Sequence, residues 1–179
     1  HHRRIMSHAR SFVAGFGAAA LALTLAGCQS GAPTAAETNI TTPAVCAGVE
    51  IVIDYDLLGA NRVEECVAIA EGDTITASEA LGELGITTEG TADYGDAVIC
   101  RIDGQPSATE EFTVEGEDPY LETCATMPPA FAYWAMWIST PDAPEWAYAM
   151  EGVTTQLVGP GDALGFMFST AGATPTPAS

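Results

Sequence analysis

The chain contains no lysine, and its three histidines stand within the first eight residues. Histidine and lysine are the side chains that most often act as general bases or activate a nucleophile at neutral pH. Carboxylates are abundant, but no pair stands out as the acid and base of a glycosidase-type mechanism. We therefore expect no catalytic residues and no enzymatic activity beyond position 27.

Basic residues are almost absent beyond position 27, where Arg62 and Arg101 stand against 24 acidic residues, a formal charge of −22. A field of this sign repels phosphate backbones, so nucleic acid is excluded as a partner. We interpret the acidity as a source of solubility at a cell surface rather than as cation capture. The two arginines are expected in surface ion pairs, which are worth little; the alternative is that they orient an anionic ligand.

The sequence also lacks a hydrophobic run long enough to span a membrane. Its leading apolar run, residues 11–25, follows Arg3, Arg4 and Arg10, and its length of about 15 residues is short of the roughly 20 that spanning requires. A basic start, a short apolar run and small residues before a cysteine are typical of an export signal. The four residues at the end of this export signal, Leu25-Ala26-Gly27-Cys28, resemble a bacterial lipobox.

The lipobox resemblance implies a lipoprotein signal peptide over 1–27, cleavage before Cys28 and a lipid on the Cys28 sulfur. Two acyl chains acting together hold a protein strongly on a membrane. The expected location is the extracytoplasmic face of the cell membrane, with the lipid as anchor. An uncleaved signal anchor and an ordinary secretory signal are the alternatives.

Composition divides the rest of the chain into three parts. Residues 28–44 are rich in Ala, Thr, Gly, Ser and Pro, which predicts a flexible linker. Residues 45–169 are numerous enough to form one domain with a sizeable core. Residues 170–179 contain Thr-Pro twice and predict a disordered tail.

Four cysteines follow Cys28, an even number that predicts two disulfides in an oxidising compartment. Cys46 and Cys66 are centred on position 56, close to an expected hairpin turn at 58–61, and would face each other in an antiparallel pair. A Cys46–Cys66 bridge leaves Cys100 and Cys124 for the second. Zinc is excluded because there is no CxxC pair and no histidine beyond position 27.

Hydrophobic periodicity predicts several strands and one helix. Alternation or apolar runs place strands at 49–55, 63–70, 97–102, 131–139, 145–149 and 164–168. Thr76 and Glu79 have the spacing of a capping box. The helix they open carries one apolar face, formed by Ala77, Ala80, Leu81 and Leu84, and Gly85 suits its C-terminal end. Together, the predicted strands and the single helix indicate an α+β domain in which one short helix packs on a sheet.

Large flat side chains crowd the predicted strands 131–139 and 145–149. The candidate binding residues for a ligand or partner are Trp134, Met136, Trp137, Trp146 and Tyr148. The positions of Trp134 and Trp137 differ by an odd number, so the two side chains point to opposite faces of the strand. We expect one of them on an exposed binding face and the other in the core. The alternative is that the 105–130 segment covers the strand on both faces.

Calcium is the one metal worth considering, because carboxylates and carbonyls are its ligands. The acidic turns 93–96 and 115–118 are the candidates, and neither has EF-hand spacing. We favour solvated acidic turns and expect no metal and no cofactor.

The order of several segments resembles the β-grasp-like C-terminal domain of transcobalamin and intrinsic factor, which also occurs in bacterial surface proteins. The matching pieces lie within 49–168: an opening strand at 49–55, the lead-in Gly72-Asp73-Thr74-Ile75 to the helix, Tyr94-Gly95, Ile102-Asp103-Gly104, the aromatic strands, and Pro160-Gly161-Asp162 before the last strand. The resemblance implies a β-grasp-like mixed sheet. In the vitamin carriers it also implies one wall of a corrinoid site.

The chain departs from the vitamin carriers at several points. This sequence has no large helical domain to form the other wall, and its acidic segment 110–123 and Cys100–Cys124 pair are additional. Fold alone does not fix function. We expect non-enzymatic binding of a planar or apolar small molecule, corrinoids included, beside an uptake system. The alternative is a protein-interaction module of a cell-envelope or transporter complex.

Overall fold

The computed structural model describes residues 45–170 and 176–177. The predicted signal peptide 1–27, the lipidation site Cys28 and the linker 28–44 lie outside the described residues. Within those residues, no helix is both long and apolar enough to cross a membrane.

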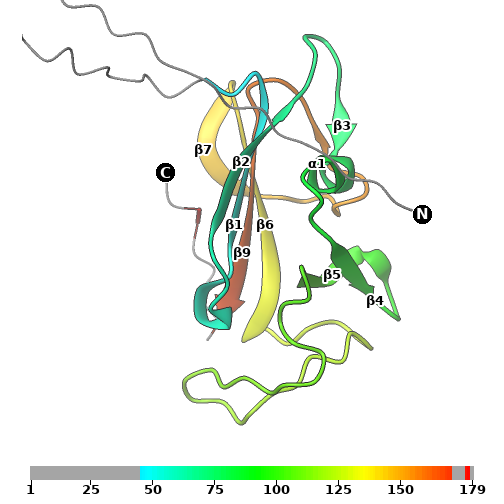
Figure 1. Cartoon of the computed structure of the whole chain (residues 1–179), viewed down its shortest axis with the longest axis vertical. Coiled ribbons are helices and arrows are strands. Elements are labelled where there is room, and N and C mark those ends of the chain that lie inside the picture. The colour runs from blue at the N-terminus through cyan, green and yellow to red at the C-terminus, as the bar shows by residue number, and fades with distance from the viewer. Residues whose placement is uncertain (1–44, 171–175, 178–179) are drawn as a thin grey trace, which may run out of the picture. The chain divides into compact units, whose positions relative to one another are not determined.

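A five-stranded mixed sheet forms the centre of the domain (Figure 1). Its strands, in spatial order, are β2 (Val63–Ala68), β1 (Gly48–Asp54), β9 (Ala163–Thr170), β6 (Ala132–Thr140) and β7 (Ala143–Tyr148). β1 and β9 run parallel, whereas every other neighbouring pair is antiparallel.

The smaller elements lie on one side of this sheet (Figure 1). They are α1 (Ala77–Glu83), the pair β3 (Ile75–Thr76) and β8 (Leu157–Val158), and the hairpin of β4 (Thr88–Thr91) and β5 (Gly95–Ile102). A short 3-10 helix, η1 (Asp56–Leu58), connects β1 to β2. The described part is therefore a small α+β domain, mostly mixed sheet with one short helix.

Every second side chain of the central strands contributes to the core on one face of the sheet. Val49, Ile51 and Ile53 of β1 are fully buried on the face that carries α1, as are Leu164, Phe166 and Phe168 of β9. The helix adds its own buried stripe of Ala77, Ala80 and Leu81. We call this side of the sheet the core face and the opposite side the outer face.

The predicted capping box is present at the start of α1. The Thr76 Oγ1 atom accepts a hydrogen bond from the Glu79 N–H at 3.2 Å, and the Thr76 N–H donates to Glu79 Oε2 at 2.7 Å. With seven residues, the helix is too short to be stable alone. Its stability comes from the apolar stripe on the sheet.

Two disulfides join the pairs that the sequence predicts. Cys46 and Cys66 are bonded beside the β1–β2 pair, with Cα atoms 5.6 Å apart. Cys100 of β5 is bonded to Cys124, with Cα atoms 5.5 Å apart, which ties the 105–130 segment to β5.

The 105–130 segment contains no helix and no named strand, and it packs on the core face. The rings of Phe112 and Phe168 are 5.8 Å apart, and those of Tyr120 and Phe131 are 5.5 Å apart. The Trp134 indole N–H donates to the carbonyl of Gln105 at 3.1 Å. These contacts cover one end of the aromatic strand on its core side.

Arg101 is buried, so its expected place in a surface ion pair is wrong. Its side chain is 5% exposed, and it donates to the Pro106 carbonyl at 2.8 Å, to Glu89 Oε2 at 2.7 Å, and to the Glu122 carbonyl. The physical reason is the 105–130 segment, whose backbone carbonyls close over the guanidinium. Arg62 does pair at the surface, with Asp54 and Glu64.

Candidate functional site

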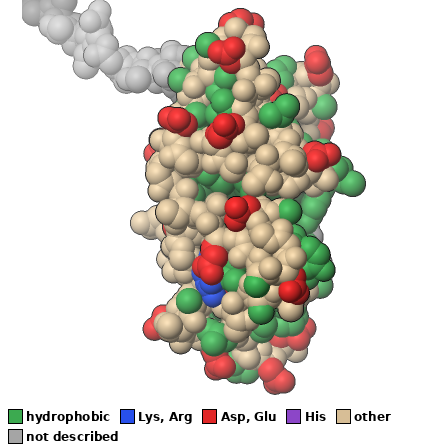
Figure 2. Space-filling model, turned by 90° about the vertical axis from the view of Figure 1, so that its right-hand side faces the viewer, with side chains coloured by type: hydrophobic (Ala, Val, Ile, Leu, Met, Phe, Trp, Pro, Cys, Tyr) green, Lys and Arg blue, Asp and Glu red, His purple; other side chains and the backbone are tan. Residues whose placement is uncertain are grey.

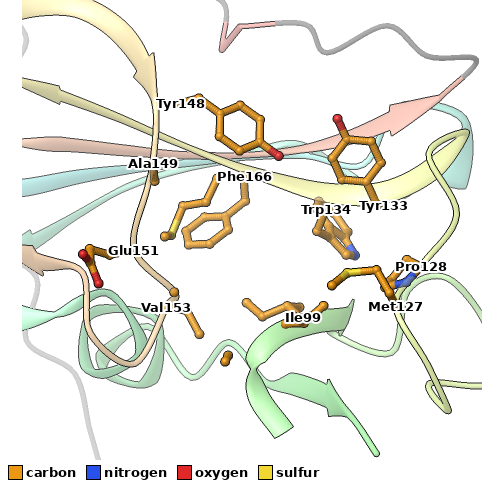
Figure 3. Close-up of a pocket in the computed structure, with 14 residues that line it drawn as sticks. Ile99, Met127, Pro128, Tyr133, Trp134, Tyr148, Ala149, Glu151, Val153 and Phe166 are labelled. Atoms are coloured by element: carbon orange, nitrogen blue, oxygen red, sulfur yellow. The ribbon is translucent and has the colours of Figure 1, made fainter. Parts of the chain in front are cut away.

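A cavity of about 230 Å³ lies beside the aromatic strand β6 (Figure 3). Trp134 and Met136 of β6 and Phe166 of β9 form the wall that belongs to the sheet. The facing wall comes from β5, and the ends are closed by Met127-Pro128 and by the segment 149–153. Its full lining is Ala97, Val98, Ile99, Met127, Pro128, Tyr133, Trp134, Met136, Tyr148, Ala149, Glu151, Gly152, Val153 and Phe166.

The cavity exists because the chain leaves the sheet at the end of β7. Tyr148 is the last residue of β7, and the next residue, Ala149, still donates its N–H to the Met136 carbonyl at 2.9 Å. The chain then crosses toward α1, where the Ser78 N–H donates to the Val153 carbonyl at 2.9 Å. Gly152 passes so close to β5 that a Cβ atom there would lie 3.2 Å from the Ala97 oxygen.

The lining is mostly apolar, with its polar groups at the margin. Glu151 is the only charged side chain that lines the cavity; it lies at one end in Figure 3, and its carboxylate accepts from Thr155 Oγ1 at 3.1 Å. The Tyr148 hydroxyl points toward Tyr133 (Figure 3). Burial raises the pKa of Tyr148, and the neighbouring Tyr133 hydroxyl raises it further. The Tyr148 phenol is therefore a neutral hydrogen-bonding group at physiological pH.

Of the five sequence candidates, two alternate onto the core face and three onto the outer face: Trp134 and Met136 on the core face, and Trp137, Trp146 and Tyr148 on the outer face, so that Tyr148 only borders the cavity. Trp134, Met136 and, at its border, Tyr148 line the cavity, whereas Trp137 and Trp146 do not. Trp137 lies opposite Tyr148 in the ladder, and their rings are 5.4 Å apart on the outer face. Alternation along β7 places Trp146 on that same outer face.

The sequence predicts opposite faces for Trp134 and Trp137, and the strand register agrees. It also predicts that one of them lies in the core and the other at a binding site, whereas the structure gives Trp134 both positions. Trp134 is 8% exposed, belongs to the core cluster and also lines the cavity. Sequence reasoning missed Ile99, Met127 and Val153 as lining residues. These residues come from three segments that are distant in the sequence and meet only in the folded structure. No local sequence pattern therefore identifies them as lining residues.

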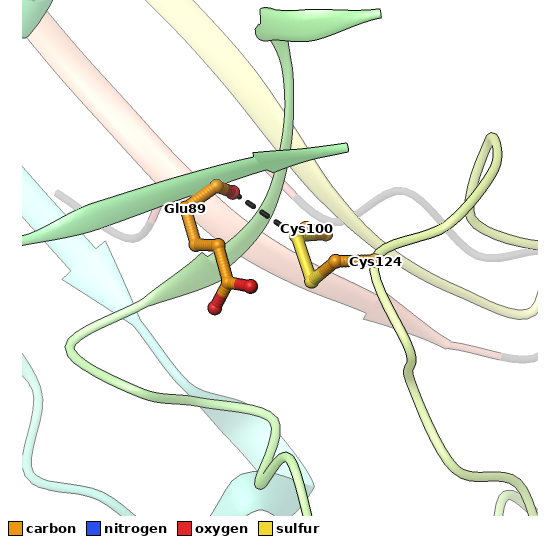
Figure 4. A group of neighbouring side chains, drawn as sticks. All are labelled: Glu89, Cys100 and Cys124. Carbon is orange, nitrogen blue, oxygen red and sulfur yellow. Dashed lines mark hydrogen bonds between the residues drawn. A yellow bond between two sulfur atoms is a disulfide. The ribbon is translucent and has the colours of Figure 1, made fainter. Parts of the chain in front are cut away.

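A second cluster, Glu89 with Cys100 and Cys124, is the one group of potential metal ligands found in the described part of the chain (Figure 4). Its two sulfurs are bonded to each other, so they are not thiolate ligands. The Cys100 sulfur lies 3.1 Å from the Glu89 carbonyl oxygen, and the Arg101 guanidinium donates to the Cys124 sulfur at 2.7 Å. A disulfide beside a guanidinium is a poor cation site.

Neither acidic turn proposed for calcium gathers three ligand groups within the residues that the structure describes. Asp93 and Asp96 are exposed, as are Glu115, Glu117 and Asp118. Carboxylates are spread over the face shown in Figure 2, and arginine appears there at one place only. This distribution is that of a solvated acidic surface.

A scan against models of protein families finds no match to this chain, and searches of curated proteins and of solved structures find none either. The assignment of function depends on the geometry of the cavity and of the sheet.

Proposed function

We propose that this chain is a non-enzymatic, lipid-anchored protein of the extracytoplasmic membrane face, whose domain binds a small planar or apolar molecule beside an uptake system. The observation that carries the proposal is the cavity, in which Trp134, Met136 and Phe166 meet around about 230 Å³. Binding sites for small molecules are concave and mostly apolar, with a few polar groups that orient the ligand. Glu151 supplies such a group at one end of the cavity.

The cavity favours a ligand of one or two fused rings. Pockets for drug-sized molecules measure roughly 300–1,000 Å³, and this one is smaller. A β-grasp-like relation to the vitamin carriers would make a corrinoid a candidate, but a whole corrin ring needs more space than the cavity offers. A corrinoid would have to rest across the mouth and insert one edge. Glu151 at one end disfavours anionic ligands by charge repulsion.

Ligand binding is tested by thermal shift and fluorescence with two neutral probes, indole and N-phenyl-1-naphthylamine. A molecule that binds only the folded state raises the melting temperature. We expect a saturable rise for the wild-type chain and none for Ala97→Phe, which places a ring in the cavity. Ala125→Phe, an exposed alanine outside the lining, is the matched control and retains binding. Equal responses from both variants would contradict the proposal.

Anchoring is tested separately, because it depends on Cys28 and not on the cavity. Cys28→Ser abolishes metabolic labelling with a radioactive or clickable fatty acid and releases the protein from the membrane fraction. Labelling that persists in this variant would show that Cys28 is not the acceptor.

The alternative function, a protein-interaction module of an envelope or transporter complex, is favoured by a different surface. Trp137, Trp146 and Tyr148 form an aromatic group on the outer face, where Tyr148 is 46% exposed. Aromatic side chains anchor many protein interfaces. Site-specific crosslinking from position 146 that captures one defined partner, while the neutral probes fail to bind, would favour this alternative.

A further inference from the structure

The outer face of the sheet carries a row of side chains that crosses all five strands. The ladder pairs Val52 with Gly165 and Gly165 with Trp137. It continues to Glu64 beyond Val52 and to Tyr148 beyond Trp137. Paired residues on one face stand side by side. Gly165 has no side chain, so the row contains a notch at the centre of the sheet, walled by Val52 and Trp137.

Pro177 fills this notch. A Cβ atom placed on Gly165 would lie 2.1 Å from Pro177 Cγ, closer than real Cβ atoms approach, and 3.2 Å from its Cβ. Pro177 is buried, although only seven positions separate it from the end of β9. Residues 176–177 therefore lie on the outer face, and Figure 1 shows them on the side of the sheet opposite α1.

Two buried hydrogen-bonding groups on the outer face are unused. Trp137 Nε1 and Ser169 Oγ have no hydrogen-bond partner, and Ser169 is fully buried. Both residues alternate onto the same face as Gly165. Neither group is hydrogen-bonded to Thr176 or Pro177, so the packing of Pro177 against Gly165, and not a hydrogen bond, is the observed contact of this segment.

Proline suits such a surface for physical reasons. Its fixed φ favours an extended polyproline conformation, so little chain entropy is lost on docking. Aromatic-lined grooves recognise proline-containing segments in this conformation. The sequence supplies two consecutive Thr-Pro units at 174–177.

We propose that the outer face is a docking groove for an extended proline-containing segment, and that the chain's own Thr176-Pro177 is its occupant. Pro177 sits in the Gly165 notch between Val52 and Trp137. The occupied groove hides apolar surface that would otherwise face solvent. This site is independent of the cavity on the core face.

A double-mutant cycle tests the contact in the full-length chain. Gly165→Ala and a deletion of residues 176–179 should each lower the melting temperature by a few degrees. Each also shifts the Trp137 indole N–H signal in NMR spectra. Combining them adds nothing, because both remove one contact. Thr113→Ala, which changes an exposed threonine outside any helix or strand, is the control and leaves both readouts in place.

Additive effects of Gly165→Ala and the deletion, or an unmoved indole signal in the deletion variant, would overturn the proposal. The trans arm uses the peptide acetyl-Thr-Pro-Thr-Pro-Ala-Ser. The deleted chain should bind it about tenfold more tightly than the full chain, in which the groove must first open. Dimers of the deleted chain that the peptide does not dissociate would identify a second copy as the occupant and contradict the assignment.

Discussion

At the scale of single residues, Arg101 holds together parts of the chain that no regular element connects. One guanidinium satisfies the carbonyls of Pro106 and Glu122 and also reaches Glu89 and the Cys124 sulfur. The planar fork of arginine can serve several acceptors at once, whereas an ammonium group cannot copy that geometry. The sequence indicated only a scarce cation, because the acceptors are backbone atoms, which have no sequence signature.

Arg101→Ala should lower the free energy of unfolding by about 3 kcal/mol, because it strands buried carbonyl acceptors that cost about 1–3 kcal/mol each. Arg101→Lys should fall between this variant and the wild type. Arg62→Ala removes only surface ion pairs and should cost less than about 1 kcal/mol. Urea denaturation measures all three. Equal losses of unfolding free energy at the two arginines would mean that the hydrogen bonds of Arg101 do not hold these parts of the chain together.

Tyr55 should make stability depend on pH in the alkaline range. Burial, together with the neighbouring Asp103 carboxylate, raises the pKa of Tyr55 from 10.0 to about 12. The folded state thus prefers the neutral phenol, and this contribution is complete below about pH 10 and is lost as pH rises through about 12. Tyr55→Phe should flatten the fall in unfolding free energy over that interval. Tyr94→Phe, on a side chain 53% exposed, is the control; an unchanged slope in Tyr55→Phe would contradict the assignment.

At the scale of elements, α1 shows what local sequence rules can achieve. Its capping box, its apolar stripe and its limits at Ala77–Glu83 agree with the pattern. By contrast β4, Thr88–Thr91, has no apolar alternation, and it forms only because β5 lies beside it. β2 ends at Ala68 rather than at 70, and β7 begins at Ala143 rather than at 145. Partners across the sheet set these boundaries.

Thr76→Ala should lower the free energy of unfolding by about 1 kcal/mol, because it removes the acceptor for the Glu79 N–H. Thr76→Ser keeps an oxygen at the same place and should restore most of the loss. Thr113→Ala, an exposed threonine outside any element, controls for the substitution itself. Thermal and urea unfolding measure the effect. A serine variant as unstable as the alanine variant would argue against the cap.

The strand β6 should respond differently on its two faces. Trp134→Ala removes a core ring and should cost about 3–5 kcal/mol. Trp137→Ala acts on the outer face and should cost clearly less. Equal losses in urea denaturation would show that both faces are core in energetic terms. The odd spacing of these residues was enough to predict opposite faces, but the cavity beside Trp134 required β5 and residues 149–153 to be placed in space.

At the scale of the whole molecule, the negative charge is not balanced by positive charge. The sequence beyond position 27 has 24 acidic residues and two arginines, and both arginines are engaged by carboxylates. Self-repulsion of this kind destabilises a compact state and is relieved by screening. Composition alone was sufficient to predict this property, since it needs no knowledge of the fold.

The melting temperature should therefore rise as NaCl is increased from about 10 mM to about 0.3 M, where the screening length falls well below 10 Å. CaCl₂ at equal ionic strength should give a rise of the same order. A much larger and saturable rise with calcium, removed by Asp93→Asn and Asp96→Asn together, would reveal a calcium site in the 93–96 turn. A melting temperature independent of NaCl would contradict the role of repulsion.

The parallel pairing of β1 with β9 has a consequence for the order in which the molecule assembles. Glu50 lies beside Ala163 at the centre of the sheet, so strands from opposite ends of the domain must meet before a core exists. Pairings this distant in sequence make folding slow, because a long loop must close before any contact rewards it. A chain synthesised from its N-terminus cannot complete this sheet until Thr170 has emerged. The contact between Pro177 and Gly165 requires residues beyond Thr170, so in such a chain it can form only after the sheet is complete.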